Sequence, residues 1–289
     1  MTVSISKLSL PPLNSLQTEN TLKAIGVFDS GVGGLSIVSC IQQTLPNESI
    51  IYVADSLHAP YGNKSLEYIQ KRVNIISDYL ISQGVKAIVI ACNTATVNAI
   101  DQLRKRVNIP IIGVEPAIKP ASTQSLQQKI GLLVTEATAQ NERFLALIEK
   151  HKQAADVTIQ PCPGLVDLIE QGDLDSPNMH ELLNKHLKPL KEKSVDTIVL
   201  GCTHYPFVAH IVKDIMGKNV TIMETALPVT EQLQRQLIQH KLINNQNITV
   251  PATLINPSIR YVSSSDSTKL NKIFNTLLNK DIYLEYVCL

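Results

Sequence analysis

The chain has 289 residues, of which 44% are hydrophobic, so it can bury a core as one large domain or as two modest domains of about 100–200 residues. Its 26 Lys and Arg residues nearly balance its 25 Asp and Glu residues, and the net charge of +1 provides no electrostatic footprint for nucleic acid or anionic lipid. Trp is absent and aromatic residues make up 4% of the chain, which argues against a stacking platform for single-stranded nucleic acid.

The N-terminal segment predicts an irregular arm rather than a targeting signal. Residues 1–20 contain no long apolar stretch and no basic start, so we expect no secretory signal. The segment contains Pro11-Pro12, and polar residues come after these prolines. We therefore expect an irregular arm over residues 1–22 and a first domain that begins at Lys23. No run of about 18 apolar residues occurs, so no membrane-spanning helix is predicted. An odd set of five cysteines is a poor disulfide framework and fits the cytoplasm, where thiols stay reduced.

Short apolar runs alternate with longer amphipathic stretches along the rest of the chain. The runs lack polar alternation, which favours strands that are covered on both faces. They cover residues 24–28, 49–54, 85–91, 110–114, 129–134 and 196–201. Helical spacing of apolar residues predicts a helix over residues 65–83, which ends before Gly84. Together these elements predict an α/β fold with mostly parallel sheets flanked by helices.

Two pairs of runs suggest that the chain contains two similar domains. Residues 85–91 precede Cys92 and the similar residues 195–201 precede Cys202, an offset of 110 residues. Residues 25–28 resemble residues 130–133 at the nearly equal offset of 105. Chance similarity between apolar strands is the alternative explanation.

Polar and nucleophilic residues follow four of the apolar runs. In an open parallel sheet, ligands bind outside the carboxyl ends of the strands, so these positions are where we look for a site. They hold Asp29 and Ser30, Cys92 to Thr94, Thr135 and Thr138, and Cys202 to His204.

The glycines after Asp29 do not complete a nucleotide-binding motif. The third glycine of the dinucleotide fingerprint would fall on Ser36, and no Gly-Lys-Ser/Thr follows. We therefore expect Gly31, Gly33 and Gly34 to form a tight turn into a helix, whose N-terminal N–H groups suit a carboxylate.

Cys92 and Cys202 are the candidates for chemistry, because each ends a strand at the same place in its half. A redox pair is more often Cys-x-x-Cys, which disfavours redox chemistry, and zinc needs at least three ligands at recognised spacing, so we expect no metal. A single nucleophile with His204 as its base would leave Cys92 idle. Two thiols across a cleft can instead take a proton from a stereocentre and return one to the opposite face, without a cofactor. The remaining cysteines are interpreted as packing residues: Cys40, Cys162 and Cys288.

Five motifs in the chain resemble the cofactor-independent aspartate/glutamate racemase family. They span residue 25 to about residue 206, and Gly-Cys-Thr-His is the most specific of them. The motifs are Phe28–Ser36, Pro60–Gly62, Ala91–Ala95, Gly113–Pro116 and Leu200–Pro206. The resemblance implies interconversion of L- and D-glutamate without a cofactor, which supplies D-glutamate for peptidoglycan and so serves cell-wall biogenesis and cell shape.

The resemblance also implies roles for single residues. Cys92 acts on the D-enantiomer and Cys202 on the L-enantiomer, and the auxiliary acids fall on Asp29, His204 and Glu170. The substrate contacts fall on Asp29, Ser30, Tyr61, Gly62, Asn93, Thr94, Thr135, Thr138, Thr203 and His204. In physical terms, Asp29 can neutralise the ammonium group, and neutral side chains with backbone N–H groups can hold carboxylates. A structural histidine and a helix cap are the plainer interpretations of His204 and Asp29.

The family's fold implies an active site in the cleft between two domains, with the second inserted into the first. We expect residues 23–117 and 226–289 to form domain 1 and residues 118–225 to form domain 2. The chain departs from the family pattern in loops rather than at the thiols: at Thr96, at Ala137-Thr138 and at Met223–Thr225. The arm and the run Pro116–Ala121 resemble a branch that a muramoyl-alanine nucleotide regulates, and a homodimer is also expected.

Three other interpretations remain open. A racemase of aspartate or another acidic amino acid keeps the chemistry and changes the substrate. In a non-catalytic protein that binds a small ligand, the thiols would be incidental. A thiol-redox enzyme would join Cys92 to Cys202 under mild oxidation.

Overall fold

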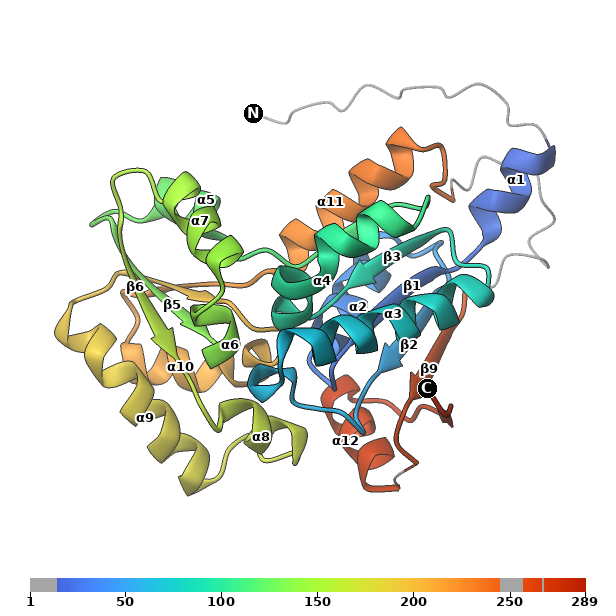
Figure 1. The fold of residues 1–289 in the computed structure, drawn as a ribbon. Helices are drawn as coiled ribbons and strands as arrows, with labels where there is room; N and C mark the ends of the chain where they lie inside the picture. Colours follow the sequence, from blue (N-terminus) through green and yellow to red (C-terminus); the bar gives the residue numbers. More distant parts are fainter. Residues whose placement is uncertain (1–14, 245–256, 267) are drawn as a thin grey trace.

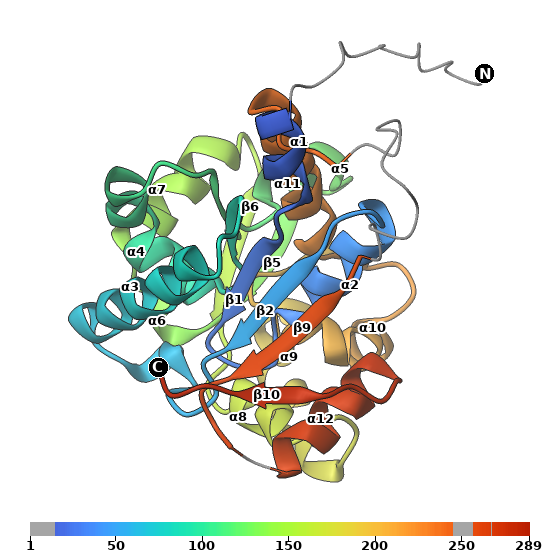
Figure 2. The same ribbon diagram turned by 90° about the vertical axis from the view of Figure 1, so that its right-hand side faces the viewer.

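Two parallel β-sheets organise the protein, which we describe from a computed structural model covering residues 15–244, 257–266 and 268–289 (Figure 1). Over these residues the larger sheet has the strand order β10-β9-β2-β1-β3-β4 and the smaller sheet the order β6-β5-β7-β8. Figure 2 shows β1, β2, β9 and β10 of the larger sheet side by side. The strands are β1 (Ile25–Asp29), β2 (Ile50–Ala54), β3 (Ala87–Ile90), β4 (Ile111–Gly113), β5 (Lys129–Val134), β6 (Asp156–Pro161), β7 (Thr197–Leu200), β8 (Thr221–Met223), β9 (Ile259–Ser263) and β10 (Leu284–Tyr286).

Helices cover both faces of each sheet, because the central strands are apolar throughout. On the larger sheet, α3 and α4 bury one face, while α2, α11 and α12 bury the other. On the smaller sheet, α5 and α7 lie on one face and α8, α9 and α10 on the other. The helices are α1 (Ser15–Leu22), α2 (Leu35–Thr44), α3 (Leu66–Ser82), α4 (Asn93–Arg106), α5 (Ile118–Gln124), α6 (Glu136–Ala139), α7 (Glu142–His151), α8 (Leu165–Glu170), α9 (Pro177–Glu192), α10 (Ala209–Met216), α11 (Ala226–Gln239) and α12 (Thr268–Leu278), with 3₁₀ turns η1 (Tyr61–Asn63) and η2 (Tyr205–Val208). None of the helices in the described ranges combines the length and apolar character needed to cross a membrane.

The predicted α/β fold is confirmed, and all six apolar runs form strands. The predicted helix over residues 65–83 is α3, whose N-cap Ser65 accepts a hydrogen bond from the Tyr68 N–H, and Gly84 follows with a φ of +74°. The sequence did not predict β6, β8, β9 and β10. Three of these are short or lie at a sheet edge, and their residues are partly exposed, so the continuous apolar signal is missing.

The N-terminal prediction was wrong where the structure describes it. Ser15–Leu22 form the helix α1 rather than an irregular arm. Leu, Gln and Glu in this segment favour a helix, and no proline lies within it. The expectation for residues 1–14 lies outside the described residues.

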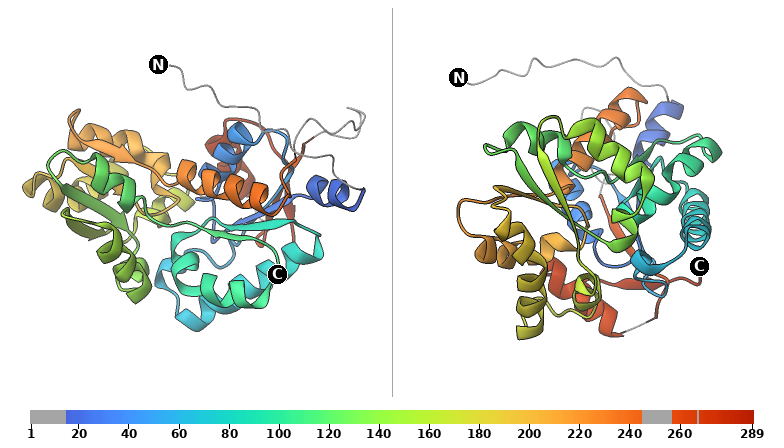
Figure 3. Two further views of the ribbon diagram at one scale, coloured as in Figure 1. Left: turned by 90° about the horizontal axis from the view of Figure 1, so that it is seen from above. Right: turned by 60° about the vertical axis from the view of Figure 1, so that its left-hand side comes forward.

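The two sheets share one topology, as the two similar halves of the sequence predicted. The order β2-β1-β3-β4 in the larger sheet matches the order β6-β5-β7-β8 in the smaller one. Strand order therefore reverses between β1 and β3 and again between β5 and β7, and such switch points are where open α/β sheets bind ligands. The larger sheet takes strands from both ends of the chain and the smaller one from residues 129–223, and Figure 3 shows the chain crossing between two lobes. We propose that the domains divide at residues 117/118 and 225/226.

A buried ion pair lies at the amino ends of the strands of the larger sheet, away from the carboxyl ends where ligands bind. Lys86, just before β3, contacts Glu48, and both side chains are almost fully buried. Lys86 also donates to the Thr21 carbonyl at 2.6 Å, and Glu48 accepts from the Asn244 N–H at 2.8 Å. The pair thereby joins the end of α1, the start of β3 and the segment after α11.

Glu48→Ala is expected to lower the free energy of unfolding by roughly 3–5 kcal/mol, because it leaves the Lys86 ammonium buried without its partner. Urea unfolding followed by circular dichroism measures the change. Glu149→Ala, which breaks the exposed Lys152–Glu149 pair, serves as control and should cost less than about 1 kcal/mol. Equal losses of unfolding free energy in both variants would show that the buried Lys86–Glu48 pair does not stabilise the fold more than an exposed pair does.

Candidate active site

A cavity of about 240 Å³ lies where the two switch points meet. Its walls come from the carboxyl ends of strands in both sheets, as the sequence predicted for the site. The cavity is smaller than the roughly 300–1,000 Å³ of sites for drug-sized ligands, so it suits a small molecule. Its lining residues are Ser30, Pro60–Asn63, Cys92–Thr94, Thr135, Glu136, Cys162–Gly164, Val166, Asp167 and Cys202–His204.

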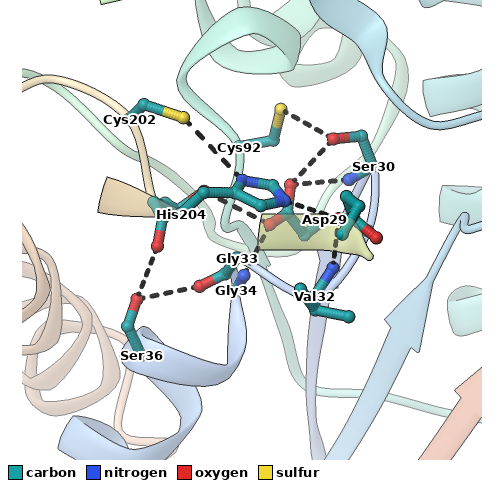
Figure 4. A network of polar contacts seen from close by, with 12 residues as sticks. Asp29, Ser30, Val32, Gly33, Gly34, Ser36, Cys92, Cys202 and His204 are labelled. Atoms are coloured by element: carbon teal, nitrogen blue, oxygen red, sulfur yellow. Dashed lines mark hydrogen bonds and ion pairs between the residues drawn. The ribbon is translucent and has the colours of Figure 1, made fainter. Parts of the chain in front are cut away.

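Cys92 reaches the cavity from the end of β3 and caps α4. Its sulfur accepts the Ala95 N–H at 3.4 Å and lies 3.8 Å from Ser30 Oγ, toward which Figure 4 shows it pointing. Burial, followed by the negative charge of Asp29, raises the pKa of Cys92 well above its usual value. Cys92 therefore holds its proton in this form of the protein.

Cys202 reaches the same cavity from the end of β7 and lies beside a histidine. Its sulfur is 3.7 Å from His204 Nδ1 (Figure 4). The other ring nitrogen, Nε2, is 2.5 Å from Glu170 Oε1. Burial alone would lower the pKa of His204, but hydrogen bonds to Cys202 and Glu170 outweigh it and raise that pKa well above its usual value. A protonated imidazole thus lies next to Cys202. By contrast, the groups that hydrogen-bond to Cys92 or act most strongly on its charge are neutral or acidic.

Asp29 connects the surroundings of the two thiols. Its Oδ1 accepts the Ser30 N–H at 2.6 Å, and its Oδ2 accepts the Thr203 hydroxyl at 3.2 Å and the Gly34 N–H. Complete burial raises the pKa of Asp29, although the nearby His204 opposes this shift. Asp29 is not among the cavity-lining residues, so its carboxylate lies one step behind Ser30 and Thr203.

The glycine turn binds carboxylates, but they belong to the protein. The Val32 N–H donates to Glu170 Oε1 at 2.7 Å and the Gly34 N–H donates to Asp29. A Cβ on Gly31 would lie 1.7 Å from Glu170 Oε1, and one on Gly33 would lie 2.3 Å from His204 Nδ1. Glycine at these positions therefore lets the turn after β1 pack closely against the acid–base residues that end α8 and follow β7.

Several neutral polar groups also line the cavity. Thr94 Oγ1 lies 3.0 Å from Thr135 Oγ1, which donates to Thr138 Oγ1 at 2.9 Å, so these hydroxyls join α4 to α6. Asn93 is 3% exposed, and neither its side-chain oxygen nor its side-chain nitrogen has a hydrogen-bond partner. No Lys or Arg is among the cavity-lining residues that the structure describes. An unpartnered buried amide in a ligand-sized cavity points to a polar ligand that completes its hydrogen bonds.

The predicted site residues fall into two groups. Most line the cavity, whereas Asp29, Glu170 and Thr138 lie behind the lining residues. Tyr61 lines the cavity, but its hydroxyl donates to Asp55 at 2.5 Å rather than standing free for a substrate.

The sequence missed several lining residues, notably Cys162, Glu136 and Asp167. Cys162 was interpreted as packing, yet it lines the cavity, and burial raises its pKa to about 12. It follows β6, so a prediction of that strand would have placed it at a carboxyl end like the other two thiols. Cys40 is half-buried on α2 and Cys288 is exposed, and neither lines the cavity.

Comparison with known proteins identifies the class of protein that this fold and site define. Residues 25–266 match the family described as Asp/Glu/Hydantoin racemase, so the chain belongs to that family of racemases. It is similar to proteins named glutamate racemase: one from Ectopseudomonas mendocina is 45% identical over 257 residues, which cover 89% of this chain and 95% of the relative.

Solved structures agree with this assignment. Glutamate racemase from Francisella tularensis in complex with D-glutamate is 31% identical, with a TM-score of 0.79 over 92% of this chain and 98% of that one. Glutamate racemase from Escherichia coli in complex with L-glutamate and the activator UDP-MurNAc-ala is 25% identical, with a TM-score of 0.78 over 92% of this chain and 98% of that one.

Glu170→Gln is expected to lower the pKa of His204, because it removes the negative charge that favours the imidazolium. Titration of the histidine ring protons by NMR measures the change. His186 is an internal control, because burial lowers its pKa and Glu170 is not among the groups that shift it. It should titrate unchanged. An unchanged His204 titration would show that Glu170 does not set its charge.

Proposed function

We propose that the protein interconverts L- and D-glutamate by moving protons at the substrate Cα between Cys92 and Cys202. The observation that carries this proposal is that the two thiols, each from the switch point of a different sheet, line one small cavity. This arrangement supplies an acid and a base from two directions, which inversion of a stereocentre requires.

The proton transfers balance without a further reactant. One cysteine thiolate takes the proton from Cα and becomes a thiol, which leaves the carbon as a carbanion. The thiol of the other cysteine gives its proton to the opposite face of that carbon and becomes a thiolate. Matching such groups to the working pH is the usual requirement of acid–base catalysis.

The unequal surroundings of the thiols favour one free form of the enzyme. Cys92 holds its proton because burial and Asp29 raise its pKa. His204, which is 3.7 Å from Cys202 and bound to Glu170, can exchange a proton with that sulfur. If Cys92 delivers the proton that forms D-glutamate, as the family resemblance implies, its retained proton is the one that conversion of L-glutamate requires.

Glutamate fits the character of the cavity. The free amide of Asn93 and the hydroxyls of Ser30, Thr94 and Thr203 can hydrogen-bond two carboxylates. The first N–H groups of α4 have no partner within the helix, which favours an anion beside Cys92. Asp29 balances the charge of the substrate's ammonium group without lining the cavity itself, because the Ser30 and Thr203 hydroxyls that line it donate to Asp29. The Francisella tularensis and Escherichia coli structures with D- and L-glutamate support this choice of substrate.

We extend the proposal to the cell. The product D-glutamate supplies peptidoglycan synthesis in the cytoplasm. A muramoyl-alanine nucleotide is proposed as activator and a homodimer as the assembly; the Escherichia coli structure with UDP-MurNAc-ala supports the former. Racemisation measured with and without that nucleotide, and light scattering of the purified protein, test these two points.

Cys92→Ala and Cys202→Ala are each expected to lower kcat for racemisation at least about 100-fold, because each removes one of the two proton-transfer groups. Circular dichroism at 217 nm or polarimetry follows the reaction from either enantiomer, and calorimetry checks that glutamate still binds.

Cys288→Ala is the matched control, since this exposed thiol lies outside the cavity, and it should keep full activity. Full racemisation by either active-site variant would refute the two-thiol mechanism. Assays with both enantiomers of aspartate distinguish a glutamate racemase from a racemase of another acidic amino acid. If no acidic amino acid is turned over, the alternative of a non-catalytic binding protein is favoured.

A further inference from the structure

The turn that forms one wall of the cavity is closed by few main-chain hydrogen bonds of its own. Pro60 to Asn63 line the cavity in succession, and η1 is closed by one hydrogen bond, from the Lys64 N–H to the Tyr61 carbonyl. Tyr61 is 1% exposed and belongs to the same buried cluster as Cys92. The buried side chain of Tyr61 therefore anchors this wall, which also packs against α4 and α6.

Asp55 holds that anchor. It directly follows β2, is fully buried, and its backbone N–H donates to the Asp29 carbonyl at 2.9 Å. Its Oδ2 accepts the Tyr61 hydroxyl at 2.5 Å. Burial, followed by the charge of Asp55, raises the pKa of Tyr61 well above its usual value, so the phenol keeps the proton that it donates.

Arg72 completes the network from α3. Its Nε and Nη2 donate to the two oxygens of Asp55 at 2.9 and 2.8 Å, which is the bidentate geometry that fixes a carboxylate in position. Arg72 is 5% exposed, although it is charged, because it lies on the buried face of the helix. A buried carboxylate without such a partner is strongly unfavourable, so Asp55 depends on Arg72.

We infer that Arg72 and Asp55 are positioning residues, which fix Tyr61 and through it the Pro60–Asn63 wall beside Cys92. Neither Arg72 nor Asp55 lines the cavity, so neither contacts the substrate. The inference rests on the proposed racemase function for its effect on catalysis, but the placement of the wall can also be measured without substrate.

The chain offers a matched control for the loss of a buried ion pair. Lys86 and Glu48 are as deeply buried as Arg72 and Asp55, but they lie at the amino end of β3, away from the cavity. Breaking that pair should lower stability without moving the wall.

The experiment compares Tyr61→Phe, Arg72→Met, Arg72→Lys and Glu48→Ala in the full chain, at a temperature where circular dichroism shows each to be folded. Tyr61→Phe and Arg72→Met are expected to lower kcat/KM for both glutamate enantiomers by about 10–100-fold, mainly through KM, because the wall is displaced. Arg72→Lys should restore only part of the loss, since an ammonium cannot form the bidentate pair. Glu48→Ala should keep the wild-type kcat/KM.

A second readout is the rate at which iodoacetamide alkylates Cys92 in a Cys162→Ala/Cys202→Ala background without substrate. We expect faster alkylation in Tyr61→Phe and Arg72→Met than in the background alone or with Glu48→Ala. Unchanged alkylation and unchanged kcat/KM in folded Tyr61→Phe would overturn the inference, as would equal changes in Glu48→Ala. If the wild type does not racemise glutamate, the proposed function fails, and alkylation alone then decides the inference.

Discussion

The carboxylate of Asp29 is the group on which the arrangement of both thiols depends. It lies at the end of β1, at the switch point of the larger sheet, and it accepts hydrogen bonds from Ser30, beside Cys92, and from Thr203, the neighbour of Cys202. It also lies behind the cavity wall, where burial keeps water away and raises its pKa. One buried charge thus ties the carboxyl ends of two separate sheets together and sets the electrostatic surroundings of Cys92.

The glycine turn makes this close approach possible. Val32 and Gly34 offer N–H groups to Glu170 and Asp29, so the positive end of the turn is filled by two carboxylates of the protein. A side chain on Gly31 or Gly33 would occupy the positions of Glu170 and His204. The histidine–glutamate pair can stand beside Cys202 because the opposite sheet presents bare backbone at this point. The two thiols consequently differ: Cys92 is backed by Ser30 and Asp29, and Cys202 by His204 and Glu170.

Much of this arrangement can be predicted from the sequence, and the reasons are local. The apolar runs ending at Asp29, Cys92 and Cys202 are central strands buried on both faces, so pattern and position agree. The helix α3 has a serine cap and a glycine after its end, which mark its bounds. The α1 helix was missed because its neighbouring prolines suggested an irregular arm.

Other features depend on tertiary contacts that leave no local signal. Cys162 looked like a packing residue, because the partly exposed strand before it carries no apolar run. The placement of Asp29 and Glu170 behind the lining residues, and the use of the Tyr61 hydroxyl by Asp55, follow from packing between segments far apart in the chain. Motifs therefore predicted which residues gather at the site, but not which of them face the cavity.

The central claim is that two different thiols serve the two faces of one carbon. Its most direct test is the deuterium content at Cα after partial racemisation of each glutamate enantiomer in D₂O, measured by NMR early in the reaction. The account predicts that the product enantiomer carries deuterium while the recovered substrate keeps its proton, from either direction, because the group that delivers the new hydrogen is not the group that removed the old one. Equal deuterium in product and recovered substrate would mean that one base serves both faces, and it would contradict the account.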